Sequence, residues 1–315
     1  MIPNTKFMST LIETLVGTGL GLSSAKLYVS KLAMLNDKKG YNNLDFLKKK
    51  SDIDDKINTS SINLHSRKSA YTAIVSVLNK VGGEKMKKLL EYYRAKLMEI
   101  VEVVKLIPQN QKTEKQDENW IEWTEILNIH KGLADKVAKQ KTDTKSFSDN
   151  KVFTDYVLLS LYTMAPPRRN NDYIMKIGDA RSKKNETEQS NFFNKVGGVF
   201  TFRSFKNVKV VGEVELDVSP ELMSVLKMNI KRFNLQDGDF LIQNDGGSPI
   251  TTSSAITKKL QGIFLPKKVG SSMLRHSFLT YTFGDTVELQ NKLSEEMSHS
   301  VSTQRAYVVN KDAKD

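Results

Sequence analysis

Five side chains in the second half of the chain are of types that can act together on a phosphate ester. They are Arg169, Lys206, Arg275, His299 and Tyr307. Arginine suits an anionic substrate because its planar guanidinium makes bidentate contacts to phosphate oxygens and stays protonated. Taken one at a time, such residues are usually solvated or packed rather than catalytic. Their joint occurrence in short stretches with specific neighbours is therefore the informative feature.

Two C-terminal stretches carry the most specific pattern. They read SSMLRHSFLTYTF at 271–283 and MSHSVSTQRAY at 297–307. The first resembles the Leu-Arg-His-x-Phe-x-Thr box of tyrosine recombinases, and the second resembles their Gly-His-Ser box followed by the nucleophilic tyrosine. The pair predicts a member of this family of DNA breaking and rejoining enzymes, which are also called phage-type integrases.

A stretch further upstream fits the same family. LYTMAPPRRNNDYIMKI resembles its first-arginine box, in which an acidic residue stands three positions after the arginine. Asp172 takes that place if the arginine is Arg169, whereas Arg168 would leave Asn171 there. Arg169 is therefore the preferred arginine and Arg168 the lesser candidate, and we expect Asp172 to orient Arg169.

The lysine of the site is expected in a predicted hairpin. The stretch TFRSFKNVKVVGEVELDV resembles the family's β-hairpin lysine element. This places Lys206 as the expected catalytic lysine, with Lys209 close by. The resemblance implies that the lysine protonates the 5′ oxygen that departs when a strand is cut.

The resemblance also implies a covalent mechanism. Tyr307 attacks a backbone phosphate and forms a 3′-phosphotyrosyl bond, which stores the bond energy for rejoining without ATP. Arg169 and Arg275 bind the phosphate oxygens. His299 hydrogen-bonds one of those oxygens, and His276 supports the site. No metal and no cofactor are expected, because the arginines supply the positive charge that two-metal nucleases take from ions.

Two positions depart from the family pattern. Ser272 stands three residues before Arg275, where the family commonly has histidine, and Ser298 stands where a glycine is usual. The hydroxyl of Ser272 leaves open a DNA-binding regulator whose catalytic site has decayed. A second alternative is a type IB topoisomerase-like enzyme, which uses similar side chains to relax supercoils alone.

The elements that must position these residues are mainly helical. Apolar three-and-four spacing predicts helices over residues 1–107, which resemble the family's core-binding (DNA-binding) domain. The polar stretch 108–118 predicts a linker, and 119–315 the catalytic domain. Within it, the apolar run 156–164 predicts a buried helix and alternation over 199–218 predicts strands. The expected fold class is mainly α with a small antiparallel β-sheet (α+β) in the catalytic domain.

Charge and composition narrow the partners. A formal charge of +12 favours a polyanion, and with the family motifs the expected partner is double-stranded DNA. The absence of cysteine excludes disulfide scaffolds, thiolate nucleophiles and thiolate zinc sites. The four histidines are too scattered in sequence to indicate a metal cluster.

The cellular setting follows from absent signals and from the resemblance. The sequence has no apolar run near the roughly 20 residues of a membrane span and no signal-peptide pattern, so a soluble intracellular protein without membrane contact is expected. The resemblance implies a homo-tetramer on two DNA sites, with a monomer in the absence of DNA. The motif variants resemble those of viruses and mobile elements, so integration or excision of such an element is the expected use.

Overall fold

The computed structural model describes residues 5–60, 63–107, 112–140, 146–298 and 300–303. The chain forms two compact units, residues 1–111 and 112–315. This division lies inside the stretch expected to be a linker. The later part of that stretch is helical, since Glu114–Glu118 forms α6 behind a capping box between Thr113 and Gln116.

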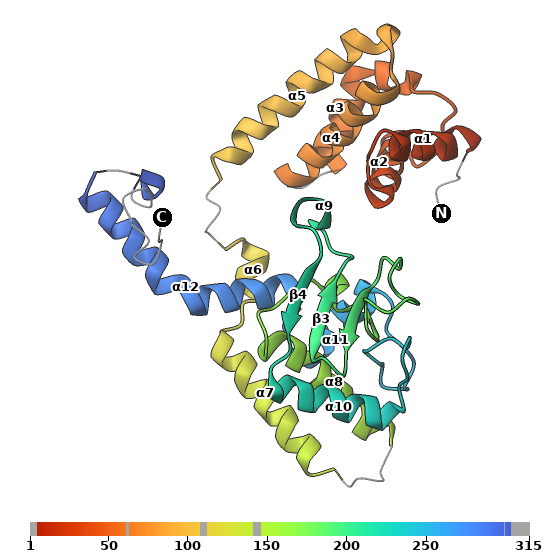
Figure 1. The fold of residues 1–315 in the computed structure, drawn as a ribbon. Coiled ribbons are helices and arrows are strands. Elements are labelled where there is room, and N and C mark those ends of the chain that lie inside the picture. The colour runs from red at the N-terminus through yellow and green to blue at the C-terminus, as the bar shows by residue number, and fades with distance from the viewer. Residues whose placement is uncertain (1–4, 61–62, 108–111, 141–145, 299, 304–315) are drawn as a thin grey trace, which may run out of the picture. The chain divides into compact units, whose positions relative to one another are not determined.

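The regular elements described in the first unit are all helices (Figure 1). They are α1 (Lys6–Gly17), α2 (Leu22–Leu35), η1 (Asp45–Lys48), α3 (Lys50–Ser60), α4 (Leu64–Val81), η2 (Glu84–Met86) and α5 (Lys87–Lys105). One apolar core joins them, with Leu32, Ile74 and Tyr93 fully buried. The Tyr93 hydroxyl donates a 2.7 Å hydrogen bond to the Leu47 carbonyl oxygen, which ties α5 to η1. The helical pattern predicted for residues 1–107 is confirmed for those that the structure describes.

The second unit combines helices with a small sheet. Its helices are α6 (Glu114–Glu118), α7 (Trp123–Ala138), α8 (Phe147–Thr163), η3 (Asn170–Tyr173), α9 (Val208–Val211), α10 (Pro220–Phe233), α11 (Ser253–Ile263) and α12 (Ser271–Glu296). Its strands are β1 (Met175–Ile177), β2 (Asn191–Asn194), β3 (Val199–Phe202) and β4 (Val214–Asp217). The predicted class, mainly α with a small sheet, is confirmed.

Helix α8 lies at the centre of the second unit. Residues 153–162 of this helix are all buried, because α7, α10 and α11 pack against it. The buried helix predicted from the apolar run is thus confirmed. A charged contact also holds α11 to α8: the Lys259 ammonium lies 2.7 Å from Asp155 Oδ1 and contacts Asp245 as well. All three groups are paired, which offsets the cost of burying their charge.

The sheet has the order β1-β2-β3-β4 and departs from the prediction in two ways. First, β1 and β2 pair in parallel, so the sheet is mixed; only the pairs β2–β3 and β3–β4 are antiparallel. Second, the expected strand over Val208–Val211 is the short helix α9. Val210 is 89% exposed, so this valine run has no apolar surface against which a strand could pack.

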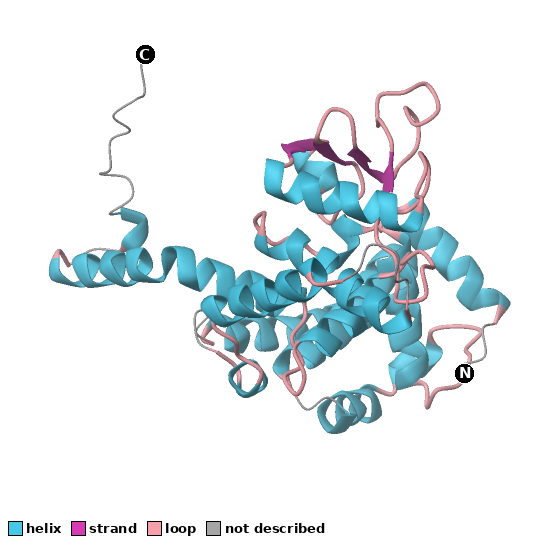
Figure 2. Cartoon of the chain, turned by 90° about the horizontal axis from the view of Figure 1, so that it is seen from below, coloured by secondary structure: helices cyan, strands magenta, loops and turns pink. Residues whose placement is uncertain are grey.

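Helix α12 packs into the second unit at its start, and its later part is mostly exposed. Its first turns bury Met273 and Leu274, whereas Tyr281, Phe283 and Leu289 further along are exposed. Figure 2 shows this later part running out past the other helices of the unit. Across the described residues, no helix combines the length and apolarity that a membrane span requires.

Candidate active site

The turn that carries the two neighbouring arginines is fixed by buried hydrogen bonds. The Tyr162 hydroxyl, at the end of α8, donates to Asn170 Oδ1 at 2.7 Å. Asn170 Nδ2 donates onward to α11, to the Ser253 carbonyl oxygen at 3.1 Å and to Thr257 Oγ1 at 2.8 Å. The Tyr173 hydroxyl closes the turn by donating to the Leu161 carbonyl oxygen at 2.7 Å. The side chains of Arg168 and Arg169 therefore project from a turn that these hydrogen bonds hold in place.

Arg168 is the arginine that pairs with Asp172. Its Nε donates to Asp172 Oδ2 at 3.1 Å, and its guanidinium carbon lies 3.9 Å from the Phe202 ring centroid. The expectation that Asp172 orients Arg169 is corrected here: four-residue spacing across the η3 turn brings the carboxylate to Arg168 instead. Burial raises the pKa of Asp172, and the charge of Arg168 opposes that rise.

Arg169 is left available to a ligand. The residue is half-buried, and its guanidinium makes no hydrogen bond or ion pair with any residue that the structure describes. The Asp172 carboxylate acts on the charge of Arg169, but its ion pair is with Arg168. An anionic ligand would supply the missing partner.

Arg275 lies on the second turn of α12, near Arg169. Burial lowers the pKa of the Arg275 guanidinium, and the like charge of Arg169 lowers it further, while Asp172 opposes the shift. Its Nε donates to the Ser271 carbonyl oxygen at 3.3 Å, and no carboxylate lies within ion-pair distance among the described residues. Two guanidinium groups that repel each other form a site whose charge favours an anion such as phosphate.

The start of α12 is held in place by side chains from the same motif as Arg275. The Ser277 hydroxyl donates to the Ile121 carbonyl oxygen at 2.8 Å. Leu274 is fully buried, and the Phe278 ring packs on the edge of Trp123 with centroids 5.1 Å apart. These anchors fix the helix turn from which Arg275 projects.

Lys206 shares a cavity with Arg169. The cavity has a volume of about 600 Å³, and its lining includes Arg169, Asp172, Asn191, Phe205 and Lys206. Lys206 lies in the loop between β3 and β4, is exposed, and has no hydrogen-bond or ion-pair partner among the described residues. The structure thus brings Arg169 and Lys206 together at one cavity, with Arg275 electrostatically coupled to Arg169.

The structure does not place the other predicted site residues at this cavity. Ser272 and His276 are exposed on the first two turns of α12, and neither side chain has a hydrogen-bond partner among the described residues. His299 and Tyr307 lie outside the described residues. Within the described part of the chain, no group of three or more histidine, aspartate or glutamate side chains is placed to hold a metal ion.

One wall of the cavity was not anticipated from the sequence. Gln189 and Ser190, just before β2, line it together with Asn191, the first residue of β2, and Ser204 lines it two residues after β3. Their only sequence signal is a short polar run before Phe192 and Phe193, a pattern that is common at exposed strand ends. The partners of such residues become visible only when the strands are paired.

Comparisons with known proteins add a distant structural similarity. No family model matches the sequence, and no curated protein matches it. Among solved structures, the chain is similar to one titled "Crystal structure of XerA recombinase", with a TM-score of 0.34 and 16% sequence identity. The alignment covers 98% of this chain and 94% of that chain. A similarity of this size assigns no residue and no chemistry.

Replacing Arg168 by alanine is expected to destabilise the second unit rather than to impair a chemical step directly. The Arg168 and Asp172 side chains are 23% and 5% exposed, so the change leaves a buried carboxylate unpaired. Asp172 Oδ1 already has no hydrogen-bond partner among the described residues. The expected loss is about 3 kcal/mol in the free energy of unfolding at pH 7, measured by urea denaturation.

The pH dependence of that loss identifies its cause. The native pKa of Asp172 is already raised from 3.8, so its ionised form opposes folding above that pKa and its protonated form does not. Without Arg168 the native pKa rises further. The difference in the free energy of unfolding between Arg168→Ala and wild type should therefore shrink as the pH falls through the pKa that Asp172 has in the folded variant. The control is Arg181→Ala, which breaks an exposed pair with Glu215 and should cost less than about 1 kcal/mol; equal losses for both variants would contradict the assignment.

Proposed function

We propose that the chain is a tyrosine recombinase that cleaves and rejoins DNA strands through a 3′-phosphotyrosyl bond to Tyr307. The observation that carries the proposal is the convergence of two arginines without carboxylate partners and one unpaired lysine. Arg169 and Lys206 line one cavity, and the charge of Arg169 acts on Arg275. These residues come from three separate elements and stand in the order that the family motifs predict.

The arrangement suits attack on a phosphodiester. As the phenol oxygen of Tyr307 bonds to phosphorus, negative charge grows on the non-bridging oxygens, and fixed guanidinium donors stabilise that charge. The bond to the 5′ oxygen then breaks, and Lys206 gives its proton to that oxygen. A 5′-hydroxyl can later attack the phosphotyrosine, which returns the tyrosine and rejoins the strand.

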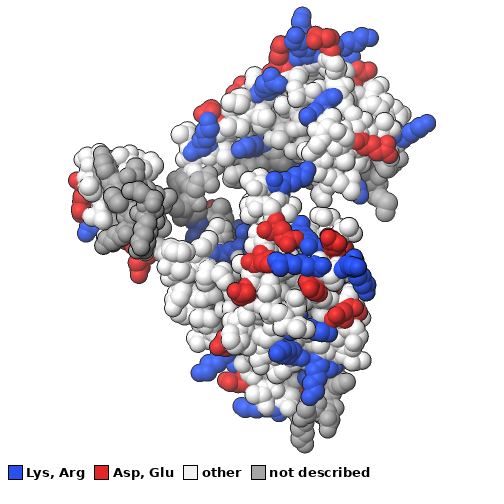
Figure 3. All heavy atoms as spheres, viewed as in Figure 1, with Lys and Arg blue, Asp and Glu red and all other residues white. Residues whose placement is uncertain are grey.

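The proposed partner is double-stranded DNA, bound by four copies of the chain on two sites. The net charge of +12 supports binding to a polyanion. On the face drawn in Figure 3, basic and acidic side chains are interspersed rather than gathered in one basic patch. This face therefore offers no basic patch for DNA, and in the proposal the arginine and lysine site places the reacting phosphate.

The proposed biological use is integration or excision of a viral or mobile element inside a cell, wherever the target DNA lies. This step rests on the variants of the family motifs, including Ser272 and Ser298. The base sequence of the target depends on side chains that contact base edges, and phosphate-binding residues carry no such information.

The test is covalent trapping on a nicked DNA substrate, from which the cut strand end diffuses away. A wild-type chain that forms a gel-resistant adduct and exchanges strands between two sites supports the proposal. Strong relaxation of supercoils by a monomer, with no strand exchange, would instead indicate a topoisomerase-like enzyme. Specific DNA binding without any adduct would indicate a regulator and overturn the proposal.

A further inference from the structure

Asn191 is the most completely bonded side chain at the cavity. It stands at the start of β2 and is 1% exposed. Its Nδ2 donates to the Asp172 carbonyl oxygen at 2.9 Å and to the Ser204 carbonyl oxygen at 3.0 Å. Its Oδ1 accepts from the backbone N–H groups of Arg203 at 2.9 Å and Ser204 at 2.7 Å. Both donors and both acceptor positions of the amide are thus used.

These four bonds join the two halves of the site. Asp172 belongs to the η3 turn that follows Arg169, and its backbone N–H donates to the Arg169 carbonyl oxygen at 2.9 Å. Arg203 and Ser204 begin the loop that carries Lys206 two residues later. One buried amide therefore connects the arginine turn directly to the base of the lysine loop.

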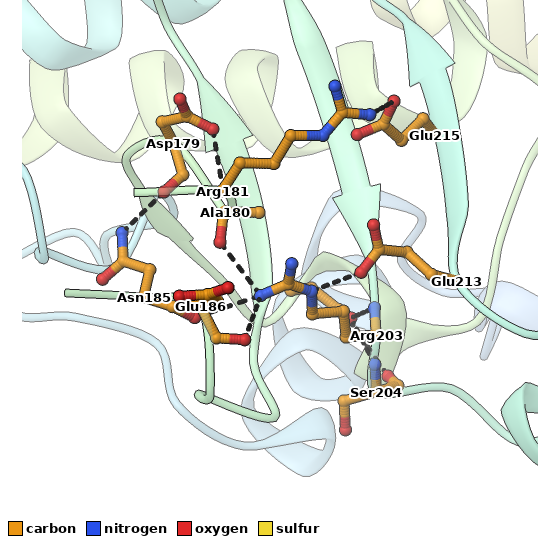
Figure 4. A network of polar contacts seen from close by, with 10 residues as sticks. Asp179, Ala180, Arg181, Asn185, Glu186, Arg203, Ser204, Glu213 and Glu215 are labelled. Carbon is orange, nitrogen blue, oxygen red and sulfur yellow. Dashed lines mark hydrogen bonds and ion pairs between the residues drawn. The ribbon is translucent and has the colours of Figure 1, made fainter. Parts of the chain in front are cut away.

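The side chain of Arg203 fixes the same loop from its other side. Its Nη1 donates to the carbonyl oxygens of Ala180 and Asn185, each at 3.0 Å, and its Nε pairs with Glu213, at the far end of the loop (Figure 4). The two ends of the loop are therefore joined to each other and to the β1–β2 connection. Lys206 itself has no bond to a described residue, so its position depends on how the loop base is held.

We infer that Asn191 is a positioning residue for cleavage, which sets the distance between Lys206 and the arginines. The inference rests on the proposed function, in which Lys206 protonates the departing 5′ oxygen. Asn191 would touch neither the phosphate nor the leaving oxygen, and it would act through the backbone of Ser204 and Asp172. Loss of its bonds would let the lysine loop shift relative to Arg169, and a displacement of about 1 Å can lower a rate by about 100-fold.

The test compares two nicked DNA substrates, one with the normal 5′ oxygen and one with sulfur in its place at the cleaved bond. A thiol has a pKa of about 8.5, so its thiolate departs without help from an acid. With the oxygen substrate, Asn191→Ala should slow adduct formation by about 100-fold. With the sulfur substrate, both Asn191→Ala and Lys206→Ala should come within about 10-fold of wild type, because neither loss of the acid nor its displacement then matters.

Asn194→Ala provides a matched control on the same strand. Asn194 Oδ1 also accepts from backbone N–H groups, those of Val196 and Gly197, but these lie in the β2–β3 turn. This variant should cleave both substrates at the wild-type rate. An equal loss on both substrates with Asn191→Ala would show a general effect on the fold and overturn the inference.

A second variant covers the case in which Asn191→Ala does not fold. Asn191→Asp has the same shape and keeps both acceptor bonds to the loop, but an oxygen replaces Nδ2, so at least one of the two donor bonds is lost. It should show the same selective loss on the oxygen substrate, and equal losses on both substrates would again overturn the inference. If the wild-type chain forms no adduct with either substrate, the proposed function itself has failed.

Discussion

A Tyr307→Phe variant is expected to bind its DNA as the wild-type chain does and to form no covalent adduct with it. Phenylalanine lacks the phenol oxygen that bonds to phosphorus, whereas Arg169, Arg275 and Lys206 remain to bind the phosphate. The proposed bond attaches the protein to a 3′ phosphate, so the strand is labelled at its 5′ end and the adduct is seen on a denaturing gel. DNA affinity is measured separately by a gel shift on an intact site.

Tyr281→Phe is the matched control for that experiment. Tyr281 lies on α12 with 62% of its surface exposed, so it is an accessible phenol on the helix that carries Arg275. This variant should form the adduct at the wild-type rate. An adduct that persists in Tyr307→Phe, or one that disappears in Tyr281→Phe, would assign the nucleophile to a different residue.

Much of the fold could be predicted because its helices bury one apolar face each. Three-and-four spacing predicted the helices of residues 1–107, and the apolar run at 156–164 predicted the buried part of α8. The strands were harder to predict, since β1, β2, β3 and β4 are only three or four residues long. Such short strands show little alternation, and the parallel pairing of β1 with β2 joins residues separated by a long loop.

For the site, the sequence motifs could select residues, but the contacts among those residues depend on how the chain packs. The motifs selected Arg169, Lys206 and Arg275; Arg169 and Lys206 line one cavity, and the charge of Arg169 lowers the pKa of Arg275. The choice of arginine for Asp172 was beyond the sequence, because both candidates stand within one turn of the carboxylate. The role of Asn191 was also hidden, since its four partners lie on two other segments of the chain.

Replacing Arg169 or Arg275 by alanine should each slow covalent adduct formation by about 100-fold to 1000-fold, or roughly 3 to 4 kcal/mol of transition-state stabilisation. Each change removes a preorganised cation from the phosphate oxygens on which charge develops. Because both cations act on one phosphate in the proposed mechanism, the double variant should lose less than the product of the two single effects. Single-turnover trapping at saturating protein separates this effect on the chemical step from any loss of DNA affinity.

The stability of these variants separates a role in binding phosphate from a role in the fold. The Arg169 side chain has no hydrogen bond or ion pair with a described residue, and its repulsion of Arg275 opposes its attraction to Asp172. Arg169→Ala should therefore unfold within about 0.5 kcal/mol of wild type. Arg168→Ala should instead lower stability, because Asp172 loses its partner, without a direct effect on the chemical step. The two variants are matched controls for each other, because they remove the same residue type from the same turn. If Arg169→Ala unfolds as easily as Arg168→Ala while adduct formation is unchanged, Arg169 serves the fold, and the phosphate site must be sought around other cations.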